Sequence, residues 1–165
     1  MITDVQVSWL AGFVDGEGSL LIPMEKNGTL KTIFSVGNTH RISIERVKEI
    51  VSEIVGRQIR YYTIHATAKN HQPLFTIRLS KKSEVLAVVK SLLPFLVTKI
   101  EQAKLMAQYI ESNPATRGQG GLGRPVVLEE HFEMARKMRH LNRRGAAALC
   151  VEAPSERLEG QPQVG

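Results

Sequence analysis

The sequence lacks the features on which secreted and membrane proteins depend. Its 165 residues include one cysteine, Cys150, which excludes an internal disulfide framework and a cysteine-based zinc site. The most apolar stretch, Val85–Val97, is interrupted by Lys90 and Pro94 and is shorter than the roughly 20 residues of a membrane-spanning helix. The first residues do not combine a basic segment, an apolar run and a cleavage site. We therefore expect an intracellular protein that is neither secreted nor bound to a membrane.

Acidic residues are too few to balance the basic ones. Asp and Glu number 16 against 22 Lys and Arg, a formal net charge of +6, and the isoelectric point is about 9.7. This excess excludes an acidic solvating protein and favours a polyanionic partner, with nucleic acid ahead of an anionic membrane surface. The hydrophobic share of 42% and a mean hydropathy of −0.12 are those of a globular chain that can bury a core.

Hydrophobic periodicity and turn residues predict the order helix, strand, strand, helix, strand, strand, helix, followed by further helices. The helices are expected at residues 4–14, 44–55, 82–93, 98–111 and 127–144, and the strands at residues 19–26, 29–37, 57–66 and 74–80. Because strands that follow one another favour antiparallel hairpins, we expect an α+β domain with helices on one face of the sheet. The domain should span residues 1–145 and include a flexible Gly-rich loop at 113–125, with a disordered tail at 146–165.

Local signals predict where several of these elements begin and end. Gly16-Glu17-Gly18 should stop the first helix near Val14 and form a turn. Asn27-Gly28 is typical of a two-residue hairpin loop. Ser43 and Thr98 are expected to cap the second and fourth helices, Thr98 as part of a capping box.

One face of the first helix is unusually small. Ser8, Gly12 and Gly16 recur at every fourth position, with Ala11 beside them, which would let two helix backbones approach closely. A glycine inside a helix costs about 1 kcal/mol relative to alanine, and close approach is a reason to accept that cost. Trp9 and Phe13 lie on a different face, suited to the protein's own core.

Two carboxylates lie at the C-terminal end of this helix. Asp15 and Glu17 meet the negative end of the helix dipole there, so they need a cation nearby, and a divalent metal is one solution. The residues alone leave an alternative open: an ordinary amphipathic helix with a glycine stop and solvated carboxylates.

The string from Leu10 to Gly18 resembles the signature of the LAGLIDADG homing endonucleases. Five of its nine positions are identical to that motif, and the other four are conservative replacements: Leu10, Ala11, Gly12, Asp15 and Gly18 are the identical ones. The predicted element order is that of the family's domain over residues 5–112, and more loosely near residues 141–145. The resemblance implies an antiparallel sheet that forms a DNA-binding saddle, and members with one motif, as here, act as homodimers.

The resemblance also implies a metal-dependent phosphodiesterase centre. The motif's last acidic position, Glu17, would hold the metal with the carbonyl of Gly16, whereas Asp15 matches a structural position. Mg²⁺ suits such oxygen ligands; we expect Mn²⁺ to substitute and Ca²⁺ to bind without supporting cleavage. The segment at residues 93–103 is similar to the family's second conserved segment, whose lysine beside the metals corresponds to Lys99.

Two further residues are weaker candidates for the same centre. Asn38 lies where single-motif members carry a polar side chain that positions water, and Arg41 is the nearest candidate for a basic residue that follows. Both fit equally well as plain turn residues.

Strand alternation predicts the surface that would meet DNA. Its members are the outward-facing side chains, some of them Arg and Gln that can read base edges: Ser19, Leu21, Pro23, Glu25, Thr29, Lys31, Ile33, Ser35, Gln58, Arg60, Tyr62, Thr76 and Arg78. The predicted dimer interface consists of Ser8, Ala11, Gly12 and Asp15, together with Gly16. A basic run at residues 136–144 either contacts phosphates or forms a solvated helix face.

These expectations define a site-specific double-strand DNA endonuclease of a mobile intron or intein. It would act as a homodimer on a palindromic or nearly palindromic duplex, in the cytoplasm of a prokaryote or in an organelle. Two alternatives use the same scaffold: an RNA maturase that binds its intron, and a catalytically inactive DNA-binding regulator. The presence of both Glu17 and Lys99 argues against the inactive regulator. A basic α+β protein of unrelated function is the remaining alternative.

Overall fold

The computed structural model describes residues 2–65, 72–113 and 127–143. Its helices are α1 (Asp4–Glu17), α2 (Arg41–Val55), α3 (Lys82–Leu92), α4 (Ile100–Ser112) and α5 (Glu129–Leu141). Its strands are β1 (Gly18–Leu21), β2 (Ile33–Asn38), β3 (Tyr62–Ile64) and β4 (Leu74–Leu79). The strands form one antiparallel sheet in the order β1-β2-β4-β3, and the predicted α+β fold with its αββαββα order is confirmed.

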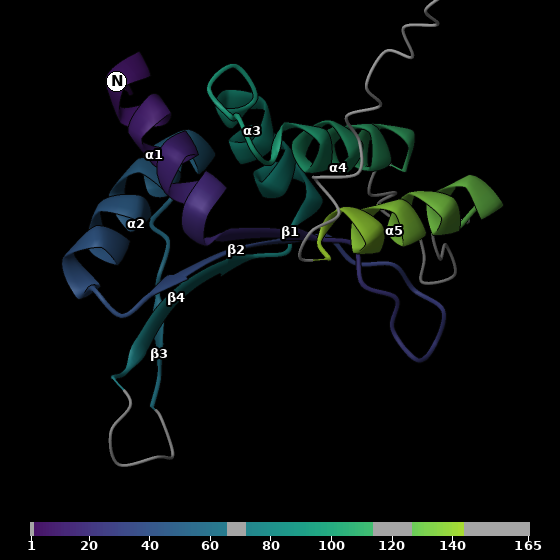
Figure 1. Cartoon of the computed structure of the whole chain (residues 1–165), viewed down its shortest axis with the longest axis horizontal. Helices are drawn as coiled ribbons and strands as arrows, with labels where there is room; N and C mark the ends of the chain where they lie inside the picture. Colours follow the sequence, from purple (N-terminus) through teal and green to yellow (C-terminus); the bar gives the residue numbers. More distant parts are fainter. Residues whose placement is uncertain (1, 66–71, 114–126, 144–165) are drawn as a thin grey trace, which may run out of the picture.

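The helices lie over one face of a curved sheet, and the other face is left open (Figure 1). Leu20, Phe34 and Ile77 point from the sheet into the core, where each is at most 2% exposed. They meet fully buried side chains of the helices, such as Leu10 and Ile44. The alternation of buried and exposed positions along β1 follows from the pleat, which sends successive side chains to opposite faces.

Helix α1 is longer than predicted. It continues through Gly16 and Glu17 and ends at Gly18, whose backbone is extended and leads directly into β1. The expected turn at residues 16–18 is therefore wrong, because glycine also adopts ordinary helical angles when neighbouring structure stabilises them. Gly18 is required for a different reason: a Cβ there would lie 2.7 Å from both Cγ1 and the carbonyl oxygen of Val14.

The β1–β2 connection is a hairpin with a three-residue loop, not the predicted two-residue loop. The Glu25 N–H donates to the Thr29 carbonyl at 2.8 Å, and the Gly28 N–H donates to the Glu25 carbonyl at 3.0 Å. Within this loop, only Gly28 takes a positive φ, of 80°, as in a type I turn followed by a glycine bulge. Regular pairing of β1 stops at Leu21, shortly before Pro23, which has no N–H to donate to a strand.

Two predicted helix caps are absent. Helix α2 begins at Arg41 and ends, as predicted, at Gly56 with a φ of 70°, but the Ser43 hydroxyl contacts Nδ1 of His40 at 2.9 Å instead of capping. Helix α4 begins after Lys99 without a side-chain cap, because the Thr98 hydroxyl is hydrogen-bonded elsewhere.

Helix α5 packs against α4 and the outer edge of the sheet. It starts at Glu129 rather than at residue 127; Met138 is buried, and the Asn142 amide donates to the Leu20 carbonyl at 2.8 Å. This bond occupies part of the free edge of β1, which would otherwise be open to pairing with another strand.

Of the predicted loop at 113–125, only Asn113 is described, and it closes α4. The rest of that loop and the predicted tail at 146–165 lie outside the described residues. None of the described helices is long and apolar enough to cross a membrane.

Candidate active site and DNA interface

Asp15 joins the end of α1 to the segment that precedes α4. Its carboxylate accepts hydrogen bonds from the main-chain N–H groups of Val97 and Lys99 at 2.8 and 2.9 Å. Thr98 adds its N–H at 3.2 Å and its hydroxyl at 3.0 Å. Partial burial acts to raise the pKa of Asp15, but these hydrogen bonds outweigh it and hold the pKa below its usual value.

Lys99 is held by the last turn of the same helix. Its Nζ donates to the main-chain carbonyl of Asp15, one of the carbonyls near the helix end where the dipole is negative. A lysine at the start of α4 is unfavourable for that helix's own dipole, and this contact supplies the compensating partner. The result places the ammonium group of Lys99 beside the end of α1 that carries Glu17.

Glu17 points into solvent at this end of the helix. Its side chain is exposed, and none of the hydrogen bonds or ion pairs between described residues involves it. Residue 18 pairs with Val36, so the strand register places Asn38, two residues further along β2, at the same end of the sheet. Asp15, Glu17 and Lys99 therefore lie together at the end of α1, and Asn38 lies at the corresponding end of β2.

The side chains of Asn38 and Arg41 are already engaged. The side-chain oxygen Oδ1 of Asn38 accepts a hydrogen bond from the main-chain N–H of His40 at 2.8 Å. This leaves the side-chain nitrogen Nδ2 of Asn38 available to donate. Arg41 Nε donates to Glu45 at 2.8 Å across one turn of α2. This exposed ion pair contributes little to stability, so Arg41 is free to exchange it for another anion.

One chain supplies few ligands for a metal. No group of three or more His, Cys, Asp or Glu side chains that could hold an ion occurs within residues 2–65, 72–113 and 127–143. The Glu17 carboxylate and the Gly16 carbonyl are oxygen donors of the kind that Mg²⁺ prefers, and both belong to exposed residues. They fit part of a coordination shell, which a second copy of the same pair could extend.

The small face of α1 is open to solvent. Ser8, Gly12 and Gly16 are exposed, and a Cβ built at either glycine would meet no atom within 4 Å. Ala11, by contrast, is fully buried in the chain's own core, so its predicted place in a dimer interface is wrong. Asp15, also predicted there, is partly buried and binds its own chain.

An aromatic side chain adjoins this face. Trp9 is 40% exposed and stacks on Phe13 with 5.3 Å between ring centroids, so its predicted place in the core is wrong. Val5 and Ile42, also predominantly exposed, line the same shallow pocket as Trp9. Side chains from two helices thus form one exposed apolar patch, and sequence spacing on α1 alone did not indicate the contribution of Ile42 from α2.

Most of the predicted DNA-contacting set is at least partly exposed, on the strands of the sheet, in the β1–β2 connection and just before β3. The exposed members are Ser19, Leu21, Lys31, Gln58, Arg60, Tyr62 and Arg78; the partly exposed ones are Pro23, Glu25, Thr29 and Ser35. Glu25 and Lys31 form an ion pair across the hairpin. Gln58 and Arg60 precede the short strand β3 instead of lying within it.

Two members of the set are not accessible. Ile33 and Thr76 are only 5% and 6% exposed, so the prediction that they face DNA freely is wrong. Thr76 pairs with Tyr62 on one side and Gly37 on the other. Ile64, in contrast, is 48% exposed two residues after Tyr62 on the same face, and the alternation that selected Tyr62 would have identified it.

Comparison with known proteins now assigns the chain to a class. Residues 10–113 match the LAGLIDADG endonuclease family, which is well over half of the sequence. The chain therefore belongs to the LAGLIDADG endonuclease family, as the motif predicted. No curated protein matches it.

Solved structures share the fold. An archaeal intron-encoded homing endonuclease complexed with DNA is similar with a TM-score of 0.58 and 16% identity, covering 86% of this chain and 87% of that one. The homing endonuclease I-CvuI, in complex with the I-CreI target and with Mg present, gives a TM-score of 0.52 and 19% identity over 82% of this chain and 96% of that one. A second I-CvuI structure, in complex with its own target, was obtained in the presence of Ca. At these identities the likeness shows the fold.

Proposed function

We propose that this protein is a homodimeric, metal-dependent homing endonuclease that makes a double-strand cut at a specific DNA site. The observation that carries the proposal is the open small face of α1, which ends beside Lys99 in an exposed Glu17 that has no ion-pair or hydrogen-bond partner among the described residues. Family membership over residues 10–113 supports the endonuclease activity. The DNA complexes among the structural neighbours support duplex DNA as the substrate.

Two copies would pack through their α1 helices. In the described part of the chain, Gly12 and Gly16 make no contact that requires glycine, yet glycine lowers helix stability. A second α1 against this face would explain both residues, since only small side chains permit close helix approach. The two Glu17 side chains would then lie near each other at the centre of the dimer, each serving one DNA strand.

Each residue of the centre has a defined task toward the phosphate. The Glu17 carboxylate and the Gly16 carbonyl would hold Mg²⁺ or another divalent cation, which, when bound, neutralises charge on the attacking and leaving oxygens. The Lys99 ammonium group would stabilise the extra negative charge that develops on the phosphate. The free amide nitrogen of Asn38 would donate to water or phosphate, and Asp15 would keep Lys99 in place.

The cleavage test uses a plasmid library with randomised inserts and compares wild type with Glu17→Gln. The wild-type protein should linearise a subset of plasmids with Mg²⁺ or Mn²⁺, and not with Ca²⁺ or EDTA. Glu17→Gln preserves shape but removes the ligand charge, so it should bind the recovered sites without cutting them. Undiminished cleavage by this variant would refute the role given to Glu17.

A further inference from the structure

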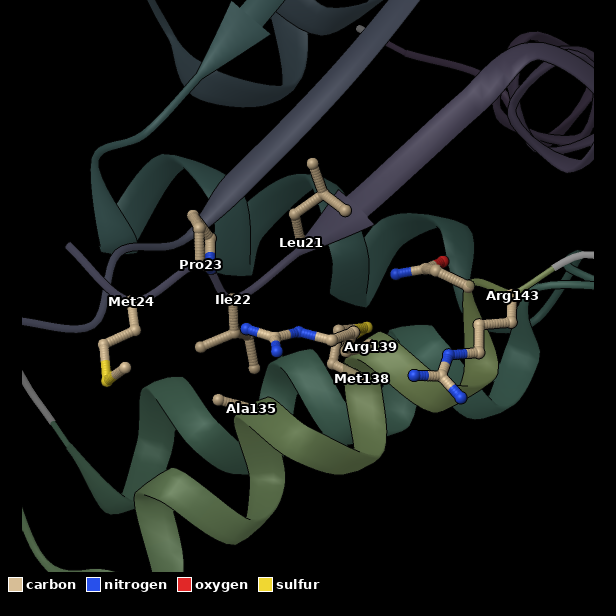
Figure 2. Close-up of a pocket in the computed structure, with 9 residues that line it drawn as sticks. Leu21, Ile22, Pro23, Met24, Ala135, Met138, Arg139 and Arg143 are labelled. Atoms are coloured by element: carbon tan, nitrogen blue, oxygen red, sulfur yellow. The ribbon is translucent and has the colours of Figure 1, made fainter.

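A hollow between the end of β1 and α5 lies outside the predicted DNA-contacting set. We call it the α5 hollow; it measures about 410 Å³ and is lined by residues 21–24 and by Ala135, Met138, Arg139, Asn142 and Arg143. Figure 2 shows the Arg139 side chain extending from α5 toward Ile22, with Arg143 about one turn further along. One wall is therefore apolar and the other carries two guanidinium groups.

The two arginines have no anionic partner in the described part of the chain. Between the described residues, no ion pair or hydrogen bond involves the side chain of Arg139 or Arg143, whereas Arg136 is paired with Glu129 at 2.8 Å. Both guanidinium groups line the same hollow, where like charges repel each other, so an anion between them would be stabilising. Within the basic run, Arg136 is therefore neutralised by its own helix, whereas Arg139 and Arg143 line the hollow.

The hollow is continuous with the surface already described. Leu21, which lines it, is 37% exposed on the open face of the sheet, and the Asn142–Leu20 hydrogen bond fixes α5 against β1 at this point. The chain from Glu17 to Met24 is largely extended, so the hollow lies about 20 Å from Glu17, at roughly 3.3 Å per residue. That separation corresponds to about six base pairs of duplex, at about 3.4 Å per step.

We propose that the α5 hollow binds backbone phosphates of duplex DNA at the outer flank of each half-site, through Arg139 and Arg143. This inference rests on the proposed function and extends its substrate surface from the sheet onto α5. A guanidinium fork matches phosphate geometry, and the apolar wall of residues 21–24 would pack against deoxyribose. Such contacts fix position along the duplex and carry no base preference.

The test measures binding of a 40-base-pair duplex of arbitrary sequence by fluorescence anisotropy, without divalent metal, from 50 to 200 mM salt. R139Q/R143Q removes both charges but keeps the side-chain stems, and it should weaken binding about tenfold or more. The slope of log affinity against log salt should flatten by about 0.9 for each lost phosphate contact. R139K/R143K should retain the slope while losing part of the affinity, because lysine keeps the charge but not the fork.

The matched control is K90Q/K104Q, which removes two charges from helices α3 and α4. Lys90 and Lys104 are exposed and paired with Glu111 and Glu101, so the net charge falls equally while the hollow stays intact. Unchanged or tighter binding by R139Q/R143Q, or an equal loss in the control, would overturn the inference. The single variant R143Q, two residues beyond the end of α5, repeats the test with the least effect on folding. Wild-type protein that fails to bind any duplex at 50 mM salt would refute the proposed function itself.

Discussion

Substituting alanine for Gly12 should change the stability of the protomer and of the dimer in opposite directions. Gly12 is exposed in the interior of α1, its φ is not in the left-handed region, and a Cβ there would meet no atom within 4 Å. Alanine is therefore accommodated without strain and is more favourable than glycine in a helix by about 0.8–1.0 kcal/mol. Gly12→Ala should raise the free energy of unfolding of the isolated protomer by about 1 kcal/mol.

Association should respond in the opposite way. If two α1 helices meet at Gly12, each copy contributes one added methyl group to a tightly packed contact. Overpacking of this kind costs about 1–3 kcal/mol, and each 1.4 kcal/mol weakens the dissociation constant about tenfold. We expect the Gly12→Ala dimer to dissociate at least tenfold more readily and cleavage to fall with the loss of dimer.

Two measurements separate these effects. Urea unfolding at concentrations below the dissociation constant reports the protomer alone, since association adds to apparent stability at higher concentration. Sedimentation of the same samples reports the dimer, with about twice the 18.4 kDa of one chain expected for wild type. Gln108→Ala, at an exposed position of α4, is the control, because it raises helix propensity away from α1. The reasoning is refuted if Gly12→Ala stabilises the protomer but leaves association unchanged, or if it destabilises the protomer.

Three further predictions concern buried charge, the α1–α4 connection and salt. Arg57 donates two hydrogen bonds, at 2.9 and 2.7 Å, to the buried carboxylate of Glu84. Arg57→Ala should lower the free energy of unfolding at pH 7, because it removes the arginine that donates both bonds to this carboxylate. The loss should be smaller than for a fully buried pair, because the arginine is half exposed. The hydrogen bonds from Arg57 lower the pKa of Glu84. The stabilisation by this ion pair is therefore fully present above the unfolded-state pKa near 4 and is lost as pH falls through the folded-state pKa. In urea titrations, the loss of stability caused by Arg57→Ala should be smaller at pH 3 than at pH 7, and equal losses would contradict this reasoning. Asp15→Asn should lower the free energy of unfolding by about 1–2 kcal/mol, with the same pH dependence, because the pKa of Asp15 is also lowered. The variant should reduce cleavage more than DNA binding, because it displaces Lys99. Cleavage equal to wild type would argue against the role of Asp15 in positioning Lys99. Affinity for DNA should fall steeply with salt, by about 0.9 in the log–log slope for each neutralised phosphate, and a flat response would count against the DNA surface.

The fold was predictable because short-range patterns and long-range packing agree. Alternating apolar residues in β2 and the helical spacing in α2 place Phe34, Val36, Ile44 and Val47 in the core, and all four are fully buried. Gly56 ends α2 as its conformational freedom predicts. The motif at residues 10–18 added the family, which composition alone did not indicate.

The errors arise where distant residues decide local structure. Thr98 matches a capping box in sequence, but Asp15, which is remote along the chain, binds its hydroxyl and N–H. Trp9 has the character of a core residue, yet the core is filled by Val7, Leu10 and Val14 from the adjacent face of α1. Neither outcome can be obtained from propensity or spacing, because both depend on which helices pack together.

The most direct test of a homodimeric endonuclease is the symmetry of the DNA sites that it cuts. Sequencing of the ends produced from a randomised library with Mg²⁺ maps both cuts and the base preferences around them. Two identical subunits present the same reading surfaces about a two-fold axis, so preferences contributed by Arg60, Tyr62 and Arg78 should recur symmetrically in both halves. Cut sites with unrelated halves, or the absence of any cut with RNA as the only ligand bound, would contradict the account.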